Sequence, residues 1–154
     1  MATPALALLA DRGIPHEVLT YEHRTKGARP AARALGLPTE TVLKSLVFLA
    51  DDGTALFALM DGGGRVSEKK LARESAHKRV APAPLQDAER LTGYQAGGIS
   101  PLGAKTALPV FLDAASSHQR TVVINAGARG TLVRLATDDL ITLTAARIAD
   151  LRVE

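Results

Sequence analysis

The sequence predicts one compact α/β domain in which a mixed, largely antiparallel sheet is surrounded by helices. Its 154 residues, 46% of them hydrophobic and 23% charged, suit a single globular domain with its own core. Short alternating segments typical of strands follow helix-like segments along the chain, without a linker, an internal repeat or a low-complexity stretch. Two strand pairs are separated only by short glycine-containing turns, which predicts hairpins and therefore antiparallel pairing.

The first third of the chain is predicted to form a helix, a strand and a second helix. Thr3 is expected to cap a helix that starts with a proline and that Gly13 ends. Residues 16–23 alternate, which predicts a strand, and residues 28–35 are alanine-rich and helical. Between them lies a basic connector, residues 23–27. We interpret this connector as a solvated loop, with a phosphate contact as the alternative.

The segment 42–49 is apolar on both of its alternating faces, which predicts a strand buried on both sides. Lys44 lies inside this strand. A buried ammonium group costs free energy unless it reaches a partner or water. Three interpretations therefore stay open: the side chain extends to water at the strand end, it pairs with a carboxylate, or it lines a pocket. In a pocket it would be suited to anchor a phosphate or a carbonyl oxygen.

The middle and the end of the chain continue the alternation of helices and strands. A turn at residues 51–54 predicts that residues 55–60 are the returning strand of a hairpin. The glycine loop 61–64 is followed by no Gly-Lys-Ser/Thr sequence, so we do not interpret it as a phosphate-binding loop. The further predicted elements are a helix 67–74 capped by Ser67 with Lys69, Lys70 and Arg73 exposed, a short strand 79–81, a helix 84–91, strands 108–113, 121–125 and 131–135, and a last helix capped by residues 137–139 and followed by an amphipathic tail.

Residues 93–103 are expected to form a loop that packs onto the protein. They contain four glycines and one proline, which is incompatible with a regular helix or strand. The apolar residues Ala96, Ile99 and Leu102 favour a packed loop over a polar linker. Bare backbone N–H groups in such a loop can hold an anion or polarise a carbonyl group. The plainer alternative is a glycine-rich turn that only joins two elements.

Composition argues against several classes of function. The sequence contains no apolar run of about 18 residues, so we expect no membrane span. It has no cysteine, which excludes disulfides and a thiolate nucleophile and agrees with a cytoplasmic location. The net charge of +3 is compatible with an RNA or phosphate ligand but is weak evidence for one. Aromatic residues make up only 3%, which argues against an extended surface for stacking single-stranded bases.

The polar residues match no common catalytic or metal-binding motif. The four histidines lack metal-ligand spacing, so we expect no metal and no cofactor. Ser100 is followed by Pro101 and lies outside a Gly-x-Ser-x-Gly motif, which makes it a poor nucleophile candidate. What remains is Lys44, the loop 93–103 and a second glycine turn at residues 125–130. These parts suit binding and electrostatic polarisation better than covalent catalysis.

Two blocks of this sequence resemble the YbaK/EbsC family of free-standing aminoacyl-tRNA deacylases, which are related to the editing domain of bacterial prolyl-tRNA synthetases. The first block is residues 41–48 around Lys44, and the second is the loop 93–103. The resemblance spans nearly the whole chain, so we expect residues 1–154 to form one editing domain of this kind. It also implies a mixed, partly barrel-like sheet wrapped by helices.

The activity implied by the resemblance is removal of a wrongly attached small amino acid from tRNA. Cysteine on tRNA(Pro) is the first expectation, and alanine or another small amino acid is the second. Lys44 would be the catalytic residue and would engage the terminal adenosine or its phosphate. No protein nucleophile is implied, because in YbaK-type members the thiol of the substrate cysteine attacks its own ester. The implied substrate-binding residues are Tyr21, Ser45, Gly97, Gly98, Ile99, Ser100, Pro101, Asn125, Gly127 and Arg129.

Two positions at the implied pocket depart from the family pattern. Asn125 stands where YbaK-type members typically carry serine, and Leu132 stands where an aspartate is usual. One substitution can switch the preferred amino acid, because such a pocket separates neighbouring small side chains by only about 1–3 kcal/mol. The expected partner is the aminoacyl-tRNA 3′ end, with a prolyl-tRNA synthetase as a further candidate. Two other functions stay open: a non-catalytic tRNA-binding or synthetase-associated module, and a small-molecule esterase or thioesterase.

Overall fold

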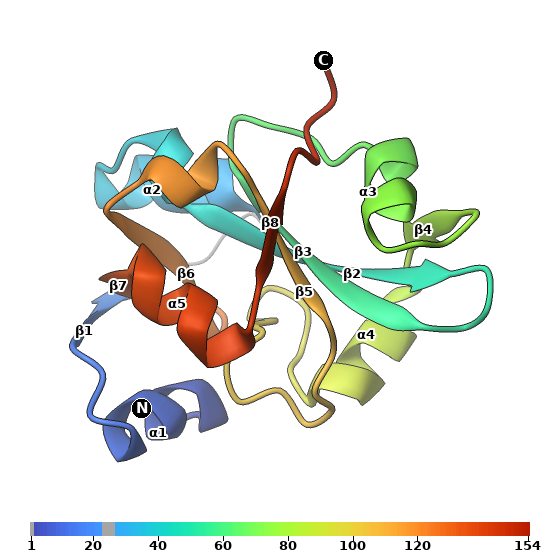
Figure 1. Ribbon diagram of the computed structural model, residues 1–154. Coiled ribbons are helices and arrows are strands. Elements are labelled where there is room, and N and C mark those ends of the chain that lie inside the picture. Colours follow the sequence, from blue (N-terminus) through green and yellow to red (C-terminus); the bar gives the residue numbers. More distant parts are fainter. Residues whose placement is uncertain (1, 23–26) are drawn as a thin grey trace.

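The computed structural model describes residues 2–22 and 27–154 of the chain. Residues 23–26, most of the predicted basic connector, lie outside the described residues. The described part forms five α-helices and eight strands (Figure 1). The helices are α1 (Pro4–Asp11), α2 (Ala28–Leu35), α3 (Glu68–Glu74), α4 (Leu85–Thr92) and α5 (Thr137–Thr144), with short 3₁₀ turns η1 (Thr39–Thr41) and η2 (Ser116–His118). The strands are β1 (His16–Thr20), β2 (Leu43–Ala50), β3 (Ala55–Asp61), β4 (Val80–Pro82), β5 (Val110–Asp113), β6 (Thr121–Ala128), β7 (Thr131–Ala136) and β8 (Arg147–Ala149).

The strands form two sheets that meet at one point. The first has the order β1-β7-β6 and the second the order β4-β2-β3-β5-β8. Neighbouring strands are antiparallel except for β3–β5 and β5–β8, which are parallel. The sheets meet where Val42, just before β2, pairs with Val123 of β6. The predicted single domain with a mixed, largely antiparallel sheet among helices is confirmed. The strands are divided over two sheets, and within the described residues they do not close into a barrel.

The inner strands of the second sheet are buried on both of their faces. Side chains of β3 alternate between two apolar clusters: Phe57 and Leu59 belong to one, and Ala58 and Met60 belong to the other. The first cluster also contains Leu9 of α1 and residues of β6, so it fills the space between the two sheets. Residues of β2 contribute to both clusters as well, which confirms the prediction of a strand buried on both sides.

Several element ends lie where the sequence predicts them. Thr3 Oγ1 accepts a hydrogen bond of 3.1 Å from Leu6 N, and Ser67 Oγ accepts one of 3.2 Å from the backbone N–H three residues later. α2 covers the predicted residues 28–35, and the chain leaves it through Gly36 in a left-handed conformation. None of the described helices is both long and apolar enough to cross a membrane.

The end of the chain differs from the prediction. After α5, residues Arg147–Ala149 form β8 and pair in parallel with β5, where only an amphipathic tail was expected. Three largely exposed residues carry too little periodicity to be predicted as a strand. The predicted cap at residues 137–139 is also wrong. α5 has no side-chain cap, and Thr137 Oγ1 instead donates to the carbonyl of Gln119 at 2.6 Å.

Three smaller differences also arise from long-range contacts. β1 ends at Thr20, and β6 continues to Ala128 through a β-bulge, so that the turn before β7 is shorter than predicted. Lys70, which the sequence places in an exposed position, is half-buried, and its Nζ lies 2.9 Å from Asp150 Oδ2. β6 is longer than predicted because it pairs with β7, and Lys70 is half-buried because the C-terminal segment covers it. The sequence around β6 and Lys70 gives no sign of these distant partners.

Candidate active site

A pocket of about 210 Å³ opens between the start of β2, α2, β6 and the glycine loop 93–103. Most of its walls are apolar, and they include Val42, Leu46 and Leu132. Six of the predicted site residues line it: Tyr21, Lys44, Ser45, Gly97, Ile99 and Asn125. These residues come from separate segments of the chain, so the fold brings them together.

The pocket lies along a stretch of β2 that no described strand covers. On one side, β2 pairs with β3 along nearly its whole length. On the other side, it pairs with β4 only from Phe48 to Ala50, while Val42 meets β6 at the opposite end. Between these two points β4 and β6 diverge, and the edge of β2 at Lys44 and Ser45 faces the pocket.

Ser45 offers both its backbone and its side chain at this edge. Val47 O accepts a hydrogen bond of 2.9 Å from Ala83 N on the β4 side of β2. Because the backbone groups of alternate residues in a strand point the same way, the N–H and C=O of Ser45 point to that side too. Ser45 Oγ is buried and has no hydrogen-bond partner among the described residues. A buried hydroxyl without a partner is costly, so Ser45 is suited to receive a ligand group.

Lys44 is half-buried and lies between the pocket and the glycine turn that follows β3. Its Nζ donates a hydrogen bond of 2.6 Å to the carbonyl of Gly64. Burial lowers the pKa of Lys44, the negative charge of Asp61 raises it, and three nearby arginines lower it further. Of the three interpretations that the sequence leaves open, pocket lining agrees with this position. The catalytic role of Lys44 stays a prediction.

The two positions that depart from the family pattern form a cross-strand pair. Asn125 of β6 lies opposite Leu132 of β7, and both line the pocket. Directly opposite residues of an antiparallel pair present their side chains on the same face, so the two substitutions act on the same wall. Leu132 is 2% exposed and adds an apolar surface, whereas Asn125 supplies an amide. This side of the pocket therefore combines the apolar side chain of Leu132 with the polar amide of Asn125.

The glycine loop 93–103 is packed onto the protein, as predicted. Tyr94 is buried, and its Oη donates to the carbonyl of Leu102 at 2.7 Å, which ties together the two ends of the loop. Gly98 lies against β6 so closely that a Cβ atom there would be 2.8 Å from Ala128 N. A side chain at this position would collide with backbone, so the close approach requires glycine.

Two pocket-lining residues of this loop have backbone N–H groups that are available to a ligand. The N–H of Ala96 donates to Glu89 Oε2 at 2.9 Å, and that of Gly98 donates within the loop at 3.0 Å. The N–H groups of Gly97 and Ile99 have no protein partner among the described residues, and both residues line the pocket. Such a pair of donors can stabilise the negative charge that develops on a reacting carbonyl oxygen.

Five other predicted substrate-binding residues lie outside the pocket lining: Gly98, Ser100, Pro101, Gly127 and Arg129. Gly127 has a φ of 94°, and a Cβ atom there would meet the Tyr94 ring at 2.7 Å. Ser100 is fully buried, and its Oγ accepts a hydrogen bond of 3.1 Å from Leu102 N. Arg129 Nε donates to a loop carbonyl at 2.8 Å. These contacts support the loop from behind, and a direct contact of the five residues with substrate stays a prediction.

A second hollow of about 450 Å³ adjoins the pocket and shares Lys44 with it. The start of α2 and residues 62–65 line it, so Arg29 and Arg65 face the same space as Lys44. Arg29 Nε also donates to the carbonyl of Gly62 at 2.8 Å. Sequence reasoning misses this hollow because no lysine follows the glycines 62–64. The lysine comes from β2 instead, and three glycines directly after a buried strand are the signal that could have revealed it.

Comparison with known proteins decides the family. Residues 22–143 match the family model of the aminoacyl-tRNA editing domain. The chain belongs to the aminoacyl-tRNA editing family. The matched range contains Lys44 and the whole glycine loop, so the two sequence blocks that carry the resemblance lie within the editing domain. The family implies an aminoacyl-tRNA as the substrate.

Relatives within the editing family include both free-standing proteins and synthetases. The chain is 28% identical over 151 residues to an Enterococcus faecalis protein provisionally named Cys-tRNA(Pro)/Cys-tRNA(Cys) deacylase EbsC, covering 97% of this chain and 92% of that protein. It is 31% identical over 116 residues to a proline–tRNA ligase of Trichlorobacter lovleyi, covering 74% of this chain but only 20% of the ligase. A crystal structure provisionally described as a trans-editing enzyme for prolyl tRNA synthetase superposes with a TM-score of 0.88 at 30% identity, covering 100% of this chain and 99% of that chain.

Proposed function

We propose that the protein is a trans-editing aminoacyl-tRNA deacylase that removes cysteine from Cys-tRNA(Pro), with residues 1–154 acting as one editing domain. One observation carries this proposal: in a member of the editing family, a small pocket combines Lys44 with two unpartnered N–H groups and the unpartnered hydroxyl of Ser45. The named activity of the Enterococcus faecalis relative supports the choice of substrate. The reaction belongs in the cytoplasm, where a prolyl-tRNA synthetase would supply the mischarged tRNA.

The proposed reaction places the aminoacyl ester at the uncovered edge of β2. The carbonyl oxygen lies against the N–H groups of Gly97 and Ile99, which stabilise the charge that it gains during attack. Lys44 binds the terminal adenosine or its phosphate and so holds the ribose in place. The amino acid lies next to Ser45, whose backbone N–H and C=O groups point to the open edge of β2.

The attacking group differs between the two candidate esters. In the cysteinyl ester, the substrate thiolate attacks its own carbonyl carbon, and the bond from that carbon to the ribose oxygen breaks. The ribose oxygen takes up a proton, and cysteine leaves as a cyclic thioester. An alanyl ester has no such group, so water must attack and free alanine is released. The first route needs positioning rather than a protein nucleophile, and this requirement fits the residues that line the pocket.

The pocket walls favour a small side chain with one weakly polar group. Its volume of about 210 Å³ and its apolar lining by Leu46, Leu85 and Leu132 limit the size of the amino acid. The Ser45 hydroxyl and the Asn125 amide can contact a thiol but gain nothing from a methyl group. Cysteine is therefore the first choice and alanine the second.

Purified wild-type protein is expected to release cysteine from Cys-tRNA(Pro) at least about tenfold faster than alanine from Ala-tRNA(Pro). Pro-tRNA(Pro) should stay intact and serves as the control. The assay follows loss of the radiolabelled aminoacyl ester without any synthetase present. Faster release of alanine would replace cysteine by alanine as the substrate. If no ester is cleaved although tRNA binds, the function is that of a non-catalytic tRNA-binding module.

The second hollow is the proposed seat of a phosphate near the tRNA 3′ end. Lys44, Arg29 and Arg65 line it together, and the glycine turn 62–64 lets a ligand approach the backbone closely. Because Lys44 lines both spaces, a phosphate in this hollow would lie next to an aminoacyl group in the pocket. This arrangement favours a tRNA end over a small ester that carries no phosphate.

Arg65→Ala is expected to weaken the binding of uncharged tRNA and to flatten its dependence on salt. Loss of one phosphate contact should reduce the slope of log affinity against log salt by about 0.7–0.9. The control is Arg12→Ala, which removes an exposed arginine that lines neither the pocket nor the second hollow. Filter binding at several salt concentrations gives both slopes. Equal slopes for Arg65→Ala and the wild type would show that no phosphate contacts Arg65.

A further inference from the structure

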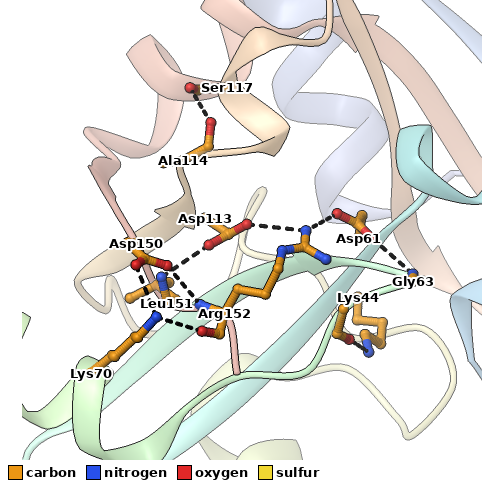
Figure 2. A network of polar contacts seen from close by, with 11 residues as sticks. Lys44, Asp61, Gly63, Lys70, Asp113, Ala114, Ser117, Asp150, Leu151 and Arg152 are labelled. Atoms are coloured by element: carbon orange, nitrogen blue, oxygen red, sulfur yellow. Dashed lines mark hydrogen bonds and ion pairs between the residues drawn. The ribbon is translucent and has the colours of Figure 1, made fainter. Parts of the chain in front are cut away.

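Two buried carboxylates at the ends of neighbouring parallel strands share one arginine (Figure 2). Asp61 ends β3 and is 4% exposed, and Asp113 ends β5 and is 1% exposed. Arg152 Nη2 forms an ion pair with Asp61 Oδ2 and lies 3.1 Å from Asp113 Oδ2. Two buried carboxylates that share a partner need a positive charge between them, and Nη2 of the guanidinium group supplies it to both.

The segment that carries Arg152 is held in place independently of this side chain. Leu151 N donates to Asp113 Oδ1 at 2.9 Å, and Val153 N donates to the carbonyl of Arg65 at 2.9 Å. Lys70 Nζ also donates to the carbonyl of Arg152 at 2.7 Å (Figure 2). The backbone around Arg152 is thus fixed on both sides, and its guanidinium group points inward to the acids (Figure 2).

The same guanidinium group lies against the glycine turn that holds Lys44. A Cβ atom on Gly64 would be 2.6 Å from Arg152 Cζ, so Arg152 packs directly over Gly64. Gly63 N donates to Asp61 Oδ1 at 2.8 Å, which ties the turn to the carboxylate that Arg152 binds. The carbonyl of Gly64 then accepts the hydrogen bond of 2.6 Å from Lys44 Nζ. A continuous set of contacts therefore runs from the C-terminal segment to Lys44.

Lys44 has both negatively and positively charged neighbours. Asp61 is the acid that faces Lys44, and the cations that face it are Arg29, Arg65 and Arg152. Asp61 raises the pKa of Lys44, and Arg152 lowers it. Because Arg152 binds Asp61 directly, it also weakens the pull of this carboxylate on the ammonium group. Moving Arg152 away would leave Asp61 free to act on Lys44.

We infer that Arg152 is a positioning residue for the candidate active site: it holds the turn 62–64 under Lys44 and screens Lys44 from Asp61. The inference rests on the proposed role of Lys44 at the substrate. Arg152 itself lines neither the pocket nor the second hollow, so it acts on the reaction through the turn 62–64 against which it packs and through Lys44, which that turn holds. The C-terminal segment becomes part of the active-site machinery, although it lies far from Lys44 in the sequence.

Gly64→Ala tests the inference without changing any charge. The new methyl group meets the flexible end of Arg152 and the Sδ atom of Met60, so we expect it to displace the guanidinium group from Asp61, and Gly64 has no left-handed backbone angle that alanine would strain. The readout is the NMR titration of Lys44 in protein labelled at lysine Cε, with the signal assigned by comparison with Lys44→Arg. We expect Lys44 to titrate about 0.5–1 pH unit higher than in the wild type. Arg152→Lys, which keeps the charge but replaces the planar guanidinium group by an ammonium group, should give a smaller shift of the same sign.

The matched control is Lys70→Met, which removes a hydrogen bond to the same segment but no contact with Asp61. It should leave the Lys44 titration unchanged. In a deacylation assay, Gly64→Ala should lower kcat about tenfold, whereas Lys70→Met should change neither kcat nor KM.

An unchanged or lowered titration point of Lys44 in folded Gly64→Ala and Arg152→Lys overturns the inference. A lower melting temperature of the variants without a change in the titration of Lys44 also overturns the inference, because Arg152 would then have a purely structural role. The titration needs no substrate. If the wild-type protein cleaves no aminoacyl ester, the proposed function fails, while the shift of Lys44 still decides whether Arg152 positions it.

Discussion

Lys44→Ala is expected to lower kcat/KM for Cys-tRNA(Pro) by about 100-fold or more while the protein stays folded. The activity falls because Lys44 is, among the residues that the structure describes, the only lysine that lines the pocket, and it lines the adjoining hollow as well. The fold survives because the side chain is half-buried and makes one hydrogen bond within the described part of the chain, to the carbonyl of Gly64. Loss of a single hydrogen bond costs about 0.5–1.5 kcal/mol, part of which is recovered because the buried ammonium is gone.

The measurements are single-turnover deacylation and thermal unfolding of the same preparations. Lys69→Ala is the control, since Lys69 is exposed on α3 and lines neither the pocket nor the adjoining hollow. A Lys44→Ala variant that keeps more than about a third of the wild-type rate would remove Lys44 from the mechanism. An unfolded variant would show that the lysine is structural.

Gly98→Ala is expected to have the second largest effect, on stability and activity together. The added methyl group would lie 2.8 Å from Ala128 N and 2.9 Å from Ala128 Cα, and these backbone atoms cannot move aside as a side chain can. The glycine loop must therefore shift away from β6, and overpacking of this kind costs about 1–3 kcal/mol. Gly97 and Ile99 move with it. A displacement of about 1 Å at the reacting carbonyl can lower the rate about 100-fold.

Thermal unfolding and deacylation at 25 °C separate the two effects. The variant should still be folded at that temperature, with a lowered melting point and a reduced kcat. The control is Gln95→Ala, which changes an exposed side chain in the same loop. If Gly98→Ala keeps the full rate, the N–H groups of Gly97 and Ile99 do not bind the carbonyl oxygen, and the loop is only a connection between α4 and β5.

The composition of the candidate site was partly visible in the sequence. Lys44 attracts notice because an ammonium group inside an apolar strand needs a special environment, and the glycines of the loop 93–103 exclude a regular element. The sequence could not separate Gly97 and Ile99, which line the pocket, from Gly98 and Ser100, which lie behind them. That difference depends on which side of the loop packs against β6. The packing becomes visible only when both segments are in place.

Local chemistry alone determined most of the secondary structure of this protein. The hydroxyl of Thr3 caps α1, and alternation across residues 42–49 marks a strand buried on two sides, since these signals act within a few residues of the chain. The tertiary structure decided where β4 and β6 leave the edge of β2 open, and that gap is the pocket. It also decided that Arg152 reaches Asp61 and the turn under Lys44. These contacts join segments about 90 residues apart in the sequence. No local periodicity or motif predicts them, because they form only when the whole chain packs together.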